Sequence, residues 1–320
     1  MRLRRHLLFL SVLALAAWAR FHGLGVRGLW LDEAYSAHLA HCGWTGLIRE
    51  LSRESTPPFY YLILHGWTSV LGEGEAALRL LSALFSLGGI GALYVLVRKH
   101  FSAGSAELAA VLIAFSPLHV YYAQEARMYA LLALLGTVLV DAAMDYVQKR
   151  GARALLVAGV SGTLMLYTHT IALWLVAGCA LAVCASARDR KTRLGWLAMV
   201  LATVLAYSPW AAVLAAQLAR QRTVLEWFNP LWESKPVAGH VVDALASMSF
   251  GPFPGYVAIR GGKLGGVVSL LGMVALAAYG LLRARDSVAA RLAGLAGVSV
   301  LGLGIAYSVL VQPVFIPGRT

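Results

Sequence analysis

Long apolar runs separated by short polar segments dominate the chain. Nine of them approach the roughly 20 residues that a helix needs to cross a bilayer core of about 30 Å. They show no sustained alternation of apolar and polar residues, so they predict helices rather than strands. The expected architecture is an all-α, polytopic transmembrane helix bundle of about nine spans. These lie near residues 6–22, 77–97, 105–121, 128–148, 153–168, 170–187, 194–213, 264–282 and 291–311.

Composition supports this reading. The 320 residues are 59% hydrophobic and 13% charged, against about 25% charged in an ordinary soluble domain, and the mean hydropathy is +0.71. A water-soluble fold is therefore excluded. A net charge of +12 suggests nucleic acid in a soluble protein, but here Lys and Arg form short clusters between apolar runs. They are typical topology signals, and no nucleic-acid partner is expected.

The apolar run from Pro57 to Gly72 decides the predicted topology. It is shorter than a span and opens with two prolines. If it lies flat at the interface, with Phe59, Tyr60, Tyr61 and Trp67 at the membrane surface, every basic cluster falls on one side, which the positive-inside rule makes cytoplasmic. These clusters are Arg2/Arg4/Arg5, Arg98/Lys99, Lys149/Arg150/Arg153, Arg188/Arg190/Lys191/Arg193 and Arg283/Arg285/Arg291.

On this topology the N-terminus is cytoplasmic and the two long external loops are residues 23–76 and 215–263. Shorter external segments lie at 118–127, 168–170 and 312–320. Residues 1–320 then form a single transmembrane domain. The abundance of Ala, Leu, Gly and Arg suggests a plasma (inner) membrane of a bacterium.

The first external loop carries a carboxylate pair, Asp32 and Glu33, in an apolar setting. Acidic groups beside a bilayer are costly unless they are hydrated, paired or used. The simpler alternative is a helix start, where acidic residues favour the helix dipole. Neighbours on a helix point about 100° apart, so Glu33 supports Asp32 without necessarily sharing its site.

Two further segments meet the same external surface. The end of the third span brings Gln124, Glu125, Arg127 and Tyr129, and the planar donor fork of an arginine suits a phosphate. The alternative for Arg127 is an ion pair that holds helices together. His169 lies in a turn between two spans, where a histidine either binds sugar or phosphate, ligates a metal, or is simply structural.

Five segments in order resemble the GT-C superfamily of membrane glycosyltransferases, in the branch related to protein O-mannosyltransferases and the lipid A aminoarabinose transferase. They are LWLDEAY, STPPFYYLILHGW, EAALRLLSALFS, FSPLHVYYAQEARMYALLALL and YTHTIALWL, within about the first 190 residues. The resemblance implies external juxtamembrane helices in the first loop. It also implies a sugar donor on a polyprenyl phosphate and an inverting transfer to a lipid, glycan or protein acceptor at the extracytoplasmic face.

The resemblance assigns roles residue by residue. Asp32 matches the family's essential acidic residue and would act as the base, with Glu33 as a second catalytic candidate. Arg127 would hold the donor phosphate, and Tyr129 and His169 would line the site with Glu125 and Gln124. Some relatives use a divalent metal at this carboxylate, which Asp32 with Glu125 or His169 would hold.

The end of the sequence departs from the family. A Pro-x-Phe-x-x-Arg-Tyr pattern is expected there, whereas residues 313–320 carry an extra glycine and lack the tyrosine. The C-terminal part is therefore expected to be shortened, which leaves a catalytically inactive homologue as one alternative. A transporter or lipid-binding membrane protein is the other, although such proteins place their charges at the midplane and show repeated halves.

Overall fold

The computed structural model describes residues 2–53, 56–221, 239 and 287–310. All regular structure in these residues is helical, and they contain no strand. The prediction of an all-α helix bundle is therefore confirmed. The expected span at 264–282, the basic residues Arg283 and Arg285, most of the loop at 215–263 and the segment 312–320 lie outside the described residues.

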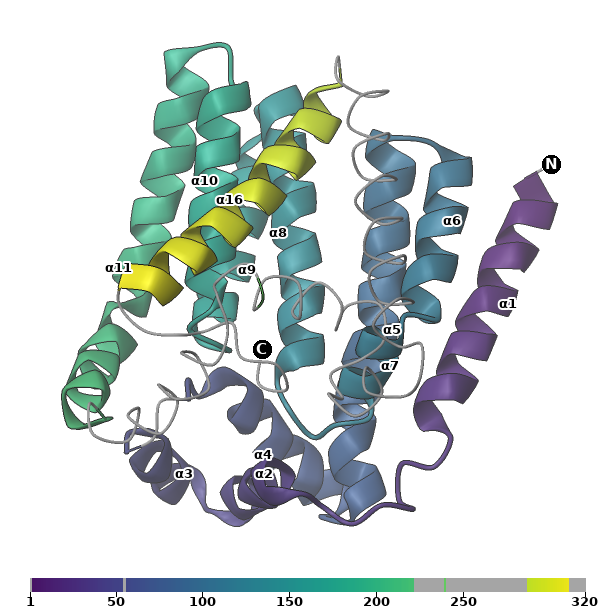
Figure 1. The fold of residues 1–320 in the computed structure, drawn as a ribbon, viewed down its shortest axis with the longest axis vertical. Coiled ribbons are helices and arrows are strands. Elements are labelled where there is room, and N and C mark those ends of the chain that lie inside the picture. Colours follow the sequence, from purple (N-terminus) through teal and green to yellow (C-terminus); the bar gives the residue numbers. More distant parts are fainter. Residues whose placement is uncertain (1, 54–55, 222–238, 240–286, 311–320) are drawn as a thin grey trace.

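The longer helices run side by side as a bundle, and α16 crosses it obliquely (Figure 1). Their positions follow the apolar runs of the sequence. They are α1 (Arg2–Phe21), α5 (Glu75–His100), α6 (Ala103–Ala114), α8 (Tyr129–Lys149), α9 (Ala152–Leu166), α10 (Ala172–Ser186), α11 (Arg190–Gln221) and α16 (Val288–Leu310).

Three shorter helices of the first long loop gather at one end of this bundle: α2 (Leu31–His41), α3 (Trp44–Leu51) and α4 (Phe59–Leu71) (Figure 1). Helix α4, the run that decides the topology, is fixed to its neighbours. Its Phe59 backbone N–H donates to the Tyr167 carbonyl at 2.8 Å, and the Trp67 indole donates to the Ala77 carbonyl at 2.8 Å. The helix is thus part of the protein's end surface.

One expectation for α4 is wrong. Tyr60 and Tyr61 were expected at the membrane surface, yet both side chains are fully buried within the protein. Both tyrosines are buried because their hydroxyls have hydrogen-bond partners there. The Tyr60 hydroxyl hydrogen-bonds Ser82 at 3.0 Å, and the Tyr61 hydroxyl accepts from Arg127. A buried hydroxyl needs such a partner, and both partners lie inside the bundle end.

Eight of the nine expected spans fall on described residues, and each is helical there. Helices α5, α8 and α11 are each long and apolar enough to cross a bilayer, and α6 with α7 (Pro117–Ala123) makes a fourth if the bent pair is one span. Helices α9 and α10 have 15 residues each, fewer than the roughly 20 of a straight crossing. The count of nine spans stays a prediction.

The expected continuous helix at 105–121 is wrong. It breaks at Phe115 and Ser116, and α7 leaves the direction of α6 by 60°. Ser116 is the N-cap of α7, where its hydroxyl accepts from the His119 backbone N–H at 3.5 Å, and Pro117 occupies the first turn. Serine followed by proline is a typical helix start, so α7 begins anew there.

Basic side chains collect at the end of the bundle opposite to α2–α4. Helix α5 begins beside α4 and ends at His100, where Lys99 forms ion pairs with Asp141 and Asp145 of α8. Further along, Arg150 pairs with Asp189 at 3.0 Å, between the ends of α8 and α10. The two ends of the bundle thus differ in chemistry.

Candidate functional site

Asp32 and Arg127 meet at the end of the bundle that carries α2–α4. Asp32 lies in the first turn of α2, and its side chain is 28% exposed. Arg127 lies in the loop between α7 and α8; its Nη2 is 3.8 Å from Asp32 Oδ2, and its Nη1 donates to the Asp32 carbonyl at 3.4 Å. The structure therefore joins an acid and a guanidinium that are 95 positions apart in the sequence.

Surrounding hydroxyls hold the Arg127 guanidinium while leaving part of it free. Its Nη1 donates to the Tyr61 hydroxyl at 2.9 Å, and its side chain also hydrogen-bonds Tyr129. Burial lowers the pKa of Arg127, but Tyr61, Tyr129 and Asp32 together hold it above its ordinary value. Its buried Nε–H has no hydrogen-bond partner among the described residues, so a fixed cation retains donor capacity.

Glu33 has a different environment from Asp32, although the two are neighbours. Its side chain is 2% exposed and forms a two-pronged ion pair with Arg79 of α5, at 2.8 and 2.6 Å. Its Oε1 also accepts from the Ala126 backbone N–H at 2.9 Å. Both carboxylate oxygens are thus occupied, and Glu33 ties α2 to α5 and to the loop that carries Arg127.

Arg79 extends this connection to the chain ahead of α2. It donates to the carbonyls of Leu24, Arg27 and Gly28 at 2.6, 2.7 and 3.0 Å. One guanidinium therefore fixes the path of the first loop up to the helix that bears Asp32. Sequence reasoning missed this residue, and the signal for it was a lone arginine four residues inside an apolar helix, where a charge needs partners.

Tyr61 is the second residue that sequence reasoning missed. Its side chain is fully buried, its hydroxyl accepts from Arg127, and it approaches Met128 Sδ at 3.9 Å. Burial raises the pKa of Tyr61, so its hydroxyl stays neutral. It orients the Arg127 guanidinium by accepting a hydrogen bond and does not neutralise its charge. The adjacent pair Tyr60–Tyr61 in the sequence gives no sign of which hydroxyl faces Arg127.

Tyr129 and His169 lie together beside Arg127. Their ring centroids are 5.9 Å apart, and the Tyr122 ring lies 4.5 Å from that of Tyr129. Burial, reinforced by the Arg127 charge, lowers the pKa of His169 to about 4. Its Nδ1 accepts from the Ile171 backbone N–H at 3.1 Å, so the neutral ring carries its proton on Nε2 and offers a donor there. The predicted turn at 168–170 is confirmed.

The side chains of Gln124 and Glu125 have their own hydrogen-bond partners within the protein. The Gln124 amide donates to the carbonyls of Ala19 and His22 at the end of α1, at 2.9 and 3.1 Å. Glu125 is 4% exposed and hydrogen-bonds Tyr121. Burial raises its pKa to about 7, with the Glu33 charge acting in the same direction. Substrate contacts by these two residues stay predictions.

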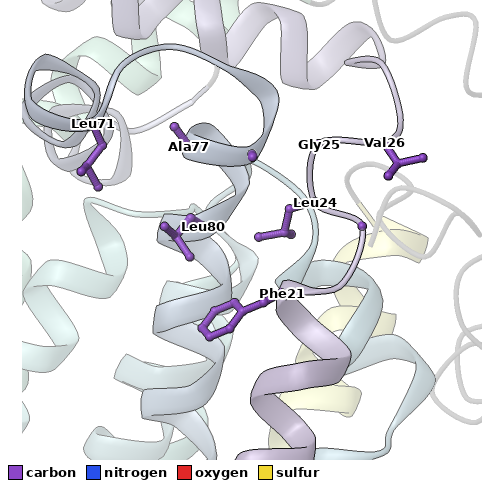
Figure 2. A pocket seen from close by; sticks show the side chains of 9 residues that line it. Phe21, Leu24, Gly25, Val26, Leu71, Ala77 and Leu80 are labelled. Atoms are coloured by element: carbon purple, nitrogen blue, oxygen red, sulfur yellow. The ribbon is translucent and has the colours of Figure 1, made fainter.

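An apolar groove of about 560 Å³ opens near the same end of the bundle. Figure 2 shows Phe21, Leu24 and Leu80 around it, between the end of α1, the loop that follows and the start of α5. Its lining contains no charged side chain. The groove is linked to the site through Leu24, whose carbonyl accepts from Arg79, and Arg79 in turn pairs with Glu33.

The residues predicted as candidate metal ligands do not form a metal cluster. In the described ranges, no three His, Cys, Asp or Glu side chains are placed to hold a metal ion together. We derive no step through a metal.

Long apolar helices and polar groups gathered at one end define an integral membrane protein. Residues 55–212, close to half of the chain, match the family described as dolichyl-phosphate-mannose-protein mannosyltransferase. The match supports the resemblance to the GT-C superfamily of membrane glycosyltransferases. The comparison with curated proteins gives no match.

The matched range covers only part of the site. It contains Arg79, Arg127, Tyr129 and His169, whereas Asp32 and Glu33 precede it. The contacts of Glu33 with Arg79 and with the Ala126 backbone connect the two parts physically.

Proposed function

We propose that the protein transfers a sugar from a polyprenyl-phosphate donor to an acceptor at the extracytoplasmic membrane face, with inversion at the anomeric carbon. The observation that carries the proposal is the approach of Asp32 to Arg127, a partly exposed carboxylate 3.8 Å from a buried guanidinium. One transfer needs both groups, because a hydroxyl must lose a proton while a phosphate leaves.

Asp32 acts as the base in this proposal. An acceptor hydroxyl oxygen attacks the anomeric carbon, and its proton passes to the Asp32 carboxylate. The bond from the anomeric carbon to the phosphate oxygen breaks, and its electron pair stays on the polyprenyl phosphate. A single displacement of this kind inverts the configuration. The observed engagement of Glu33 with Arg79 supports a positioning role for Glu33 rather than a direct part in the proton transfer.

Arg127 binds the departing phosphate. A phosphate leaves as a stabilised anion, so a fixed cation helps it more than a general acid does. The unpartnered Nε–H of Arg127 and the Nε2–H inferred for His169 supply donors for phosphate or sugar oxygens. Tyr61 and Tyr129 hold the guanidinium in place while it does so.

The apolar groove supports a lipid-linked donor. Phosphate groups bind at Arg127, whereas a polyprenyl chain needs apolar surface nearby, and the lining in Figure 2 offers this without a charge. The matched family is named for a donor of this class, a dolichyl phosphate. We place the first isoprene units of the donor in this groove.

The test is transfer in liposomes that contain purified protein, labelled polyprenyl-phosphate mannose and a panel of lipid, glycan and peptide acceptors. We expect a labelled product of inverted configuration, together with free polyprenyl phosphate. Asp32→Asn should reduce the rate about a hundredfold or more, while Glu73→Gln, an exposed acid paired with His41 at the same end, should not. Donor that crosses the bilayer uncleaved would instead show a transporter.

A further inference from the structure

A second cavity, of about 440 Å³, lies at the basic end of the bundle, opposite to the site. The end of α8, the turn between α10 and α11, and the start of α16 surround it. In Figure 1 these helix ends lie at the upper side of the view, whereas α2–α4 lie at the lower side. The cavity shares no residue with the proposed transfer site.

The lining of this cavity is positively charged. It contains Lys149, Arg150 and Arg188 against one carboxylate, Asp189. That carboxylate is already engaged: Oδ1 accepts from the Thr192 backbone N–H at 2.9 Å, and Oδ2 accepts from the Thr192 hydroxyl and from Arg150. The Arg188 side chain makes no hydrogen bond to another residue of the described part. Lys149 pairs with Asp145 of its own helix at 3.1 Å, so Arg188 is the cation of the lining without an ion-pair partner among the described residues.

Arg150 adopts an unusual backbone conformation at this place. Its φ is 54°, and it is the one residue other than glycine with a positive φ in the described ranges. The left-handed conformation is unfavourable for a residue that carries a side chain. Its ion pair with Asp189 joins side chains that are 62% and 34% exposed, and such exposed pairs contribute little to stability. The pair alone does not offset the cost of keeping an arginine here.

A hydroxyl on the cavity wall also lacks a partner. Ser186, the last residue of α10, lines the cavity, and its Oγ is buried with no hydrogen-bond partner within the described residues. A buried hydroxyl without a partner is costly, so it is a candidate for ligand binding. Together with the cations it offers one more donor to an oxygen-rich anion.

We propose that this cavity binds the phosphate headgroup of an anionic phospholipid. The ends of membrane-crossing helices lie at headgroup level, where anionic lipids are the most concentrated source of phosphate. Basic pockets between helix ends bind such headgroups. The bound lipid joins the ends of α8, α10, α11 and α16 at the side of the membrane opposite to the reaction.

Native mass spectrometry of the full-length protein, titrated with phosphatidylglycerol or phosphatidylcholine in detergent, tests this. We expect tighter binding of phosphatidylglycerol, and about thirtyfold weaker binding of it by the double variant Arg150→Gln/Arg188→Gln, as two lost cations predict. The control Arg190→Gln/Lys191→Gln removes the same charge from α11 outside the cavity lining. Because these two cations lie outside the cavity and solvent screens them, the control should weaken binding by less than about threefold.

Arg150→Gly separates binding from folding. Glycine is favoured at a left-handed helix end, so this variant should unfold at the same or a higher temperature and still bind phosphatidylglycerol about fivefold more weakly. Equal losses in the two double variants would overturn the proposal, because they would show diffuse attraction instead of a site. Equal binding of both lipids, or inorganic phosphate binding as tightly as the lipid, would overturn it as well.

Discussion

Asp32 and Glu33 are neighbours on one helix, but their carboxylates meet different surroundings. The rotation of about 100° between successive helical residues directs Glu33 inward to Arg79 and leaves Asp32 beside Arg127. The structure thus separates a buried, fully paired acid from a partly exposed one with a single long ion pair. At the scale of residues, this difference is the basis for assigning the proton transfer to Asp32.

Tyr61 and Tyr60 provide a matched pair of variants. Tyr61→Phe removes the hydroxyl that accepts from Arg127, and a hydrogen bond to a charged group contributes about 1.5–3 kcal/mol, so we expect donor binding to weaken about tenfold or more. Tyr60→Phe removes a hydroxyl of equal burial that bonds Ser82 instead, and should weaken donor binding less than about threefold. Titration of nanodisc-embedded protein with decaprenyl phosphate measures both; equal losses would contradict the role of Tyr61.

The raised pKa of Glu125 predicts that the free energy of unfolding depends on pH. Its pKa rises from 4.5 to about 7 on folding, so between these values the folded protein binds a proton that the unfolded chain does not. The stabilisation is complete below pH 4.5 and is lost as pH rises through about 7. A shift of this size corresponds to about 3 kcal/mol. The charged groups that act on Glu125 are Glu33, Arg127 and Arg27.

The Glu125→Gln variant keeps a neutral side chain at every pH. We expect its unfolding temperature to fall less than that of the wild type between pH 5 and pH 8, measured by differential scanning fluorimetry in detergent. Glu50→Gln, a surface acid paired with Arg53, serves as the control and should follow the wild type. Parallel curves for wild type and Glu125→Gln would show that Glu125 does not take up the proton.

Much of the candidate site could be predicted from the sequence, and the remainder could not for a physical reason. Asp32 and Arg127 stand out because charges are rare in this apolar chain. Tyr61 does not, and Arg79 stands out without revealing its partner, because both roles depend on which face of α4 and α5 turns inward. Pairing across 46 positions, as between Glu33 and Arg79, is decided only by packing.

The break between α6 and α7 is the main feature at the scale of elements. Arg20 of α1 is fully buried there. It donates to the carbonyls of Ile113 and Ala114 at the end of α6, and to Ser86 and His119. Hydropathy alone gave one continuous helix, because residues 105–121 are mostly apolar. Ser116 and Pro117 were the available signal for the break.

Replacing Arg20 should destabilise the protein at the break between α6 and α7. Arg20→Leu removes the bonds to Ser86, His119 and Ile113 and leaves the Ala114 carbonyl without its donor, and we expect a loss of about 3 kcal/mol or more in the free energy of unfolding. Arg20→Lys should lose less, because one ammonium replaces some of the bonds. Arg49→Leu, at an exposed position of α3, should stay within about 0.5 kcal/mol of the wild type. Urea unfolding in mixed micelles measures all three variants. An Arg20→Leu variant with the same free energy of unfolding as the wild type would contradict this account of the break.

The whole molecule has two chemically distinct ends. The site and α2–α4 occupy one, and the ion pairs of Lys99 and Arg150 occupy the other. The predicted orientation places the basic end in the cytoplasm. The fold class followed from hydropathy, because apolar length and helix length are coupled in a bilayer. The inward packing of α4 did not, because it depends on tertiary contacts.

Cysteine labelling tests this orientation. Single cysteines at positions 73 and 190, introduced after the three native cysteines are replaced by alanine, lie at exposed positions of opposite ends. An impermeant maleimide added to intact cells should label position 73 and leave position 190 unlabelled until the cells are permeabilised. Labelling of position 190 alone would show the reverse orientation. Labelling of both positions in intact cells would contradict the predicted topology.

The central claim is that Asp32 and Arg127 act on opposite ends of one breaking bond, and single-turnover kinetics with labelled polyprenyl-phosphate mannose tests it most directly. We expect Asp32→Asn to bind the donor as tightly as the wild type or more tightly, because a like charge is gone, while transfer slows about a hundredfold or more. Arg127→Gln should weaken donor binding about tenfold or more. Unchanged transfer by Asp32→Asn, or unchanged donor binding by Arg127→Gln, would contradict the account.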